Sequence, residues 1–223
     1  MAASYYDLRH KQRNALLLYT SDEPRFHEGL KLLARALRDL GINVLQQELE
    51  PNGDHNSSMR RITSWVKRND GRGNQLLLGY FGHGGKLNGR LIGAQHDLTS
   101  IQEYLRDRCE ADVLFILNTC YAGTQLGAAP RNHNTFGNRV VETIAVCDGR
   151  TLGRGNNRGS ARWLERLVRQ LAGITPGDAM LVKQVSSAIR RERHVGKTGF
   201  LGHQSFYRRE SGAGSMTLMN ISK

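Results

Sequence analysis

The sequence predicts an α/β protein with about six mostly parallel strands and helices on both faces of the sheet. Short apolar runs, such as Gln75–Phe81 and Asp112–Asn118, alternate along the chain with segments whose apolar residues recur every three or four positions. Runs of about 4–8 apolar residues bounded by turn residues are typical of strands buried on both faces of a parallel sheet. Their alternation with helices predicts a three-layer sandwich. We expect a basic lead-in over residues 1–14 and one domain over residues 15–223.

The six predicted strands are apolar segments bounded by turn residues. They span residues 15–20, 42–45, 75–81, 112–118, 139–147 and 216–221. The strongest hairpin signal, Asn88-Gly89, follows the third strand. Residues 148–159 are rich in Gly, Asn and Arg, which predicts a flexible loop after the fifth strand.

Five helices are predicted between these strands. The first is the strongest, because its leucines recur on one face and Gly41 stands where a helix ends. The second begins near Ser57. Thr99, with a glutamine three residues later, has the pattern of a capping box and opens the third helix. Ser160 is expected to cap the fourth helix, and Thr175-Pro176 to open the fifth, since proline suits the first helical turn.

The composition narrows the classes of function. The 223 residues hold 32 Lys+Arg against 20 Asp+Glu, a formal charge of +12. These basic residues are spread along the chain without interleaved aromatics, which favours a solvated basic surface over a dedicated nucleic-acid face. Three cysteines are too few for a disulfide framework, and none has metal-ligand spacing. With no apolar signal-peptide core and no run near ~18 apolar residues, we expect a cytoplasmic protein that does not enter a membrane.

Two predicted strands end in turns that each present one reactive side chain. His83 lies in the turn Gly-His-Gly-Gly after residues 75–81, and Cys120 follows residues 112–118. Since parallel strands present ligands at their carboxyl ends, an imidazole and a thiol here form a nucleophile–base arrangement. The N–H groups of Gly84 and Cys120 are the predicted donors to a substrate oxyanion. We expect a cysteine peptidase in which Cys120 attacks the peptide carbonyl and His83 is the general acid/base.

These motifs resemble those of caspase-like cysteine peptidases. The segments ALLLYT, LARALRDLGINV, LLLGYFGHGG and DVLFILNTCYAG follow one another in the order of that family and cover most of the chain. The run Cys-Tyr-Ala-Gly after residue 119 is more similar to the metacaspase-like bacterial or fungal branch than to animal caspases. The resemblance implies a caspase-like sandwich, a Cys-His dyad without a third catalytic residue, cleavage after one residue type, and a role in regulated cell death or immune defence.

The residues beside the dyad depart from the metacaspase pattern. Where that branch has a pocket aspartate two residues before the cysteine, this chain has Asn118, and where it often has serine two residues before the histidine, this chain has Phe81. Asp22, with Glu23 beside it, and Asp148 are the acidic candidates to complete the substrate pocket; Asp22 and Glu23 are equally explained as acids at a helix N-terminus. Carboxylates there would select Arg or Lys before the cut, whereas a neutral pocket would take a small or uncharged residue.

The hypothesis of a peptidase implies its partners, whereas the mode of activation stays open between self-cleavage, calcium, dimerisation and a partner protein. We expect a protein substrate and a regulatory protein or appended activating domain, no bound metal or cofactor, and no nucleic acid; homodimerisation and dependence on calcium stay open. The competing hypothesis is a catalytically silent caspase-like scaffold that binds an acidic protein or nucleic acid through its basic surface.

Overall fold

The central element of the structure is a six-stranded sheet. The computed structural model describes residues 10–20, 24–50, 53–88, 90–93, 95–122, 139–147, 158–191, 206–211 and 216–219. In sequence order the strands of this sheet are β1 (Arg13–Tyr19), β2 (Asn43–Glu48), β3 (Gln75–Phe81), β7 (Asp112–Asn118), β8 (Val141–Ala145) and β10 (Phe206–Ser211). Their order across the sheet is β10-β8-β7-β3-β1-β2, and every pair is parallel except β10 with β8. The predicted α/β class with a mostly parallel sheet is confirmed.

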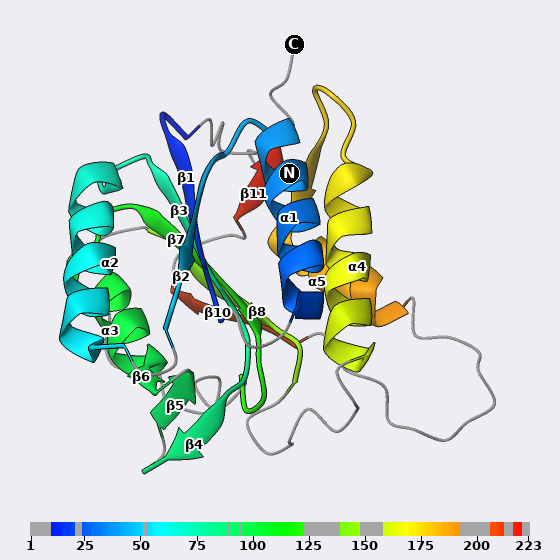
Figure 1. Ribbon diagram of the computed structural model, residues 1–223. Helices are drawn as coiled ribbons and strands as arrows, with labels where there is room; N and C mark the ends of the chain where they lie inside the picture. The colour runs from blue at the N-terminus through cyan, green and yellow to red at the C-terminus, as the bar shows by residue number, and fades with distance from the viewer. Residues whose placement is uncertain are drawn as a thin grey trace.

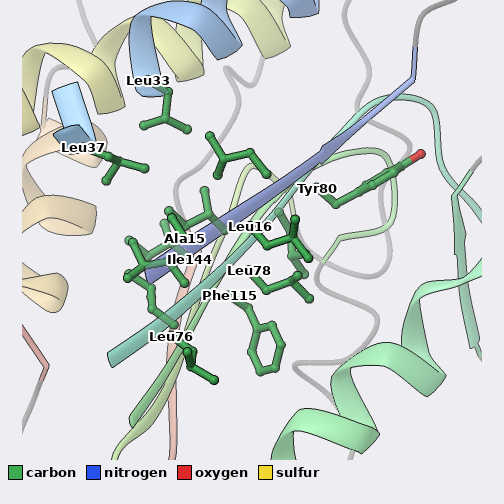
Figure 2. Close-up of a cluster of buried hydrophobic side chains, with 14 of the residues drawn as sticks. Ala15, Leu16, Leu33, Leu37, Leu76, Leu78, Tyr80, Phe115 and Ile144 are labelled. Atoms are coloured by element: carbon green, nitrogen blue, oxygen red, sulfur yellow. The ribbon is translucent and has the colours of Figure 1, made fainter. Parts of the chain in front are cut away.

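Helices cover both faces of the sheet (Figure 1). One layer holds α1 (Pro24–Asp39), α4 (Arg158–Ala172) and α5 (Val182–Arg191), and the other holds α2 (His55–Asn69) and α3 (Leu98–Arg108). The predicted apolar face of α1 is buried, and Figure 2 shows Leu33 and Leu37 directed from that helix toward the sheet. Gly41 follows the helix with φ 76°, the left-handed conformation expected of a helix-ending glycine.

Two small sheets flank the central one. β4 (Gly85–Leu87), β5 (Arg90–Gly93) and β6 (His96–Asp97) form an antiparallel sheet directly after β3. The predicted hairpin lies between β4 and β5, and Asn88 has the positive φ of 48° that such a turn requires. β9 (Ala179–Leu181) pairs with β11 (Thr217–Met219) in a separate two-stranded sheet.

The last strand of the central sheet differs from the prediction. The sixth strand is β10, whereas the apolar segment predicted for that place, residues 216–221, contributes β11 to the small sheet. β10 was missed because its sequence, FYRRES, is mostly polar. A strand at the edge of a sheet needs no continuous apolar run, since only one side of it is paired.

The predicted starts of α3 and α4 are wrong. Asp97 caps α3 by accepting from the Ser100 N–H at 3.1 Å. The Thr99 hydroxyl instead accepts from the Leu91 N–H of β5. Ser160 lies inside α4, which begins at Arg158, so the predicted loop ends earlier than residue 159.

The other boundary corrections concern α5 and β1. Residues 179–181 are a strand, so α5 begins at Val182 rather than at Thr175-Pro176. β1 begins at Arg13, which is buried and whose guanidinium donates to the Leu40 carbonyl, so the lead-in is shorter than residues 1–14. Among the described helices, none is long and apolar enough to span a membrane.

Candidate active site

The histidine and cysteine singled out in the sequence follow two neighbouring strands. β3 and β7 pair in parallel, and their register aligns Phe81 with Asn118 at the carboxyl ends. His83 and Cys120 each lie two residues beyond this aligned pair. The Gly82 N–H donates to the Asn118 carbonyl at 3.4 Å, which continues the contact past the strand ends. The two turns therefore start side by side at one edge of the sheet, where open α/β sheets bind their ligands.

Glycines bring these turns into close backbone contact. A side chain at Gly84 would overlap the Thr119 hydroxyl, and its Cβ would lie 2.9 Å from the Cys120 carbonyl oxygen. A Cβ at Gly82 would lie 2.5 Å from the hydroxyl oxygen of Thr20, which follows β1. The residues on either side of the histidine are thus packed against the ends of both neighbouring strands, and only glycine leaves room there.

Cys120 is the accessible thiol of the three. It is half-buried, whereas Cys109 and Cys147 are buried. Burial raises the pKa of the Cys109 thiol to about 12, and the negative charge of Asp70 adds to the rise. A thiol with such a pKa is inert as a nucleophile near neutral pH. Tyr121, directly after Cys120, has φ 56°, so the chain turns sharply where it presents the cysteine.

A tyrosine holds the histidine turn. His83 itself is exposed, and the Tyr80 hydroxyl donates to the His83 backbone carbonyl at 2.6 Å. Sequence reasoning treated Tyr80 only as a member of a buried strand. The available signal was its chemistry, because a buried tyrosine hydroxyl needs a hydrogen-bond partner and an apolar strand supplies none.

Two of the four predicted substrate-binding residues lie in the part of the chain that the structure describes. Phe81 and Asn118 are described, and both side chains are fully buried at the ends of β3 and β7. The ring of Phe81 lies over Gly79, where a Cβ would come within 2.6 Å of it. Asp22 and Asp148 lie outside the described residues. The assignment of these four residues to a substrate pocket stays a prediction. Within the described ranges, no group of three His, Cys, Asp or Glu residues is placed to hold a metal ion.

The architecture is similar to that of solved caspases. Caspase-1 from Spodoptera frugiperda matches with a TM-score of 0.62 and 14% sequence identity, over 99% of this chain and 91% of that chain. The Drosophila initiator caspase Dronc matches with a TM-score of 0.58 and 9% identity, over 89% and 80% of the two chains. The corresponding values for drICE are 0.52 and 17%, over 84% and 85%.

Comparisons of sequence do not assign the chain to a family. No protein-family model matches the chain, and no curated protein matches it. At identities of 9% to 17% the likeness shows the fold alone, and one fold can carry several functions. The nearness to the metacaspase-like branch stays a prediction. The chain has a caspase-like fold, with His83 and Cys120 at the carboxyl ends of two central strands.

Proposed function

We propose that this protein is a cysteine endopeptidase in which His83 and Cys120 act on a peptide bond. The observation that carries the proposal is the shared register of the two turns, which puts both residues at the same distance past a pair of hydrogen-bonded strands. The packing of Gly84 against the Cys120 carbonyl supports it, because it keeps the turns in contact. The half-buried state of Cys120 leaves its thiol within reach of a substrate.

The reaction is an acyl transfer to sulfur followed by hydrolysis. The Cys120 thiolate attacks the peptide carbonyl carbon, the S–C bond forms, and the π electron pair moves to oxygen. The oxyanion then collapses, the C–N bond breaks, and the His83 imidazolium gives its proton to the leaving amine. In the second half, His83 takes a proton from water as the oxygen attacks the thioester. The S–C bond breaks, the acid product leaves, and the thiolate–imidazolium pair is restored.

The oxyanion is the species that needs stabilisation in both halves. We assign this role to the backbone N–H groups of Gly84 and Cys120, which belong to the two contacting turns. Backbone donors of this kind are fixed before the reaction, so they need no reorganisation as charge develops on oxygen. The lack of a side chain at Gly84 lets its turn pack against Thr119 and the Cys120 carbonyl, so the two donors belong to turns that touch.

The preferred residue before the cut is proposed to be Arg or Lys. Asp22 and Asp148 would supply the negative charge, with Asn118 beside them as a neutral contributor and Phe81 as an apolar wall. A library that shows preference for small or uncharged residues would instead favour the neutral pocket. We further propose a role in regulated cell death or immune defence, with control by a regulatory protein or an appended domain; the caspase-like fold supports this role.

Substitution of the dyad tests the proposed activity. Cys120→Ala and His83→Ala should each lower hydrolysis of a peptide library by at least about 10³-fold, because each removes one half of the nucleophile–base pair. Cys109→Ala is the matched control, since that thiol is buried and lies at the end of α3. Hydrolysis should be measured with and without calcium, and folding checked by circular dichroism.

Two outcomes would contradict the peptidase assignment. One is full hydrolysis by the Cys120→Ala protein. The other is a wild-type protein that cleaves no library peptide and whose three cysteines are alkylated at equal rates. The second result would favour the silent scaffold, and salt-dependent binding to an acidic partner would then be the next measurement.

A further inference from the structure

Tyr80 connects the central sheet to the turn that carries the proposed general base. Its side chain is buried, with 1% exposure, and its hydroxyl donates to the His83 carbonyl at 2.6 Å. In Figure 2 the Tyr80 hydroxyl points away from the cluster of aliphatic side chains that fills the core. The ring therefore packs with the core while its polar end reaches the turn.

Two glycines fix the position of this hydroxyl. A Cβ at Gly93, in β5, would overlap the ring of Tyr80 and lie 2.5 Å from its hydroxyl oxygen. A Cβ at Gly82 would lie 3.0 Å from the same oxygen. The hydroxyl is thus enclosed by the backbone of the histidine turn and by the backbone of the following sheet. Close packing of this kind leaves the ring little room to move.

The hydrogen bond acts on a rigid unit that includes the next residue. The His83 carbonyl and the Gly84 N–H belong to one planar peptide group, and the described chain contains no cis peptide bond. In a trans peptide the carbonyl and the N–H point in opposite directions. Holding the carbonyl toward Tyr80 therefore fixes the direction of the Gly84 N–H away from it.

We propose that Tyr80 is a positioning residue that aims the Gly84 N–H at the oxyanion of the transition state. This inference rests on the proposed peptidase function, in which Gly84 is an oxyanion donor. Packing of Gly84 against Thr119 and the Cys120 carbonyl supports it, because these contacts restrict the Cα of Gly84 while Tyr80 restricts the peptide group before it. Tyr80 does not touch the substrate and acts only through the peptide group.

Such a residue has a characteristic kinetic signature. An oxyanion donor acts on charge that exists only in the transition state, so its misplacement lowers kcat and leaves KM nearly unchanged. Loss of a whole oxyanion donor typically costs about 10²–10³-fold in kcat. We expect a donor that is present but poorly aimed to cost less, about 10–100-fold.

Tyr80→Phe is the direct test, because it removes the hydroxyl and keeps the ring in place. The expected result is a fall of about 10–100-fold in kcat with KM unchanged within about twofold. The affinity for a peptidyl aldehyde, which forms a tetrahedral adduct, should fall by the same factor as kcat/KM. Tyr104→Phe, on α3 in the opposite helix layer from α1, is the matched control and should change neither value.

Alkylation of Cys120 by iodoacetamide distinguishes an effect of Tyr80→Phe on the oxyanion donor from an effect on the dyad. That reaction forms no oxyanion, so its rate and pH profile should be the same in Tyr80→Phe as in the wild type. His83→Ala should slow it. Gly93→Ala, which displaces the Tyr80 ring, should reproduce the kinetic defect of Tyr80→Phe. The melting temperature of Tyr80→Phe should fall by less than about 4 °C, so the protein stays folded in the assay.

The outcomes distinguish this inference from the function on which it rests. If the wild type hydrolyses peptides and Tyr80→Phe does so at the same kcat, the positioning role is wrong and the peptidase stands. If Tyr80→Phe slows iodoacetamide alkylation together with hydrolysis, Tyr80 acts through the dyad and the oxyanion assignment is wrong. If the wild type neither hydrolyses peptides nor binds the aldehyde, the peptidase assignment fails and the positioning role fails with it.

Discussion

At the scale of single residues, Gly84 and Gly85 are neighbours with opposite surroundings. A Cβ at Gly84 would overlap the Thr119 hydroxyl, and it would lie 2.9 Å from the Cys120 carbonyl oxygen. A Cβ at Gly85 would meet no atom within 4 Å. Neither glycine has a positive φ. The two glycines therefore differ in the room available for a side chain. Substitution by alanine should affect the two positions differently.

Gly84→Ala should damage the site much more than Gly85→Ala. The new methyl group must push apart the two turns, which should lower hydrolysis by about 10²-fold through misplacement of the reacting groups. The same overlap should lower the free energy of unfolding by about 1–3 kcal/mol. The control, Gly85→Ala, should retain hydrolysis within a few-fold. Steady-state kinetics and urea unfolding of both variants check this, and equal effects at the two positions would contradict the proposed contact.

At the scale of elements, Asp97 links the small sheet after β3 to helix α3. Its carboxylate accepts from the Ser100 N–H at 3.1 Å and from the Arg90 guanidinium at 2.7 Å. Arg90 also donates to Glu103 at 3.0 Å, so the hairpin between β4 and β5 is tied to the helix. Burial raises the pKa of Asp97, but the hydrogen bonds from Arg90 and Ser100 outweigh it and hold the pKa below its usual value of 3.8.

Asp97→Ala should destabilise the protein in a pH-dependent way. At pH 7 the loss of the cap should cost about 1–2 kcal/mol in the free energy of unfolding. Because the folded-state pKa is lowered, the ionised carboxyl contributes its stability above its unfolded pKa and loses it as the pH falls through the folded value. The difference between the variant and the wild type should therefore shrink below about pH 4.

Asp97→Asn distinguishes the contribution of the helix cap to stability from the contribution of the negative charge. Asp97→Asn keeps an acceptor for the Ser100 N–H, so it should cost less than the alanine at pH 7. Urea unfolding of the three proteins between pH 7 and pH 3 gives the comparison. A cost for Asp97→Ala that stays constant over this range would mean that the ionised carboxyl does not stabilise the fold.

At the scale of the whole molecule, Glu142 joins the central sheet to the last part of the chain. The side chain lies on β8 and is fully buried. It accepts from the Tyr207 hydroxyl of β10 at 2.5 Å and from the Met216 N–H at 3.0 Å. Met216 directly precedes β11, and its carbonyl accepts from the Val182 N–H that starts α5. One buried carboxyl group therefore connects β8, β10 and the two-stranded sheet of β9 and β11.

Tyr207→Phe should weaken this connection. Loss of one of the donors to this buried carboxyl group should lower the free energy of unfolding by about 1–3 kcal/mol, while the hydrophobic ring stays in place. Tyr104→Phe is again the comparison, and it should change stability by less than about 0.5 kcal/mol. Chemical unfolding measures both. Unchanged stability in Tyr207→Phe would show that Glu142 does not hold β10.

Local sequence patterns were enough to predict the class of fold and the position of the reactive pair along the chain. β3 and β7 have the predicted bounds, because strands buried on both faces are mostly apolar and each of these two runs is followed by turn residues. The same pattern marked His83 and Cys120 as the residues that follow these strands. The roles proposed for them stay to be tested by kinetics.

The pairing of elements could not be predicted in this way and is known from the tertiary contacts. Strand order depends on contacts between distant segments, so local periodicity does not predict it. The pairing of β3 with β7, which sets the turn of His83 beside the turn of Cys120, is one example. The place of β10, rather than residues 216–221, as the sixth strand is another. The hydrogen bond from the Tyr80 hydroxyl to the His83 carbonyl likewise depends on tertiary contacts and could not be predicted from the sequence. A side chain's partner is set by what the fold brings within about 3 Å of it, and residue type alone gives only the need for one.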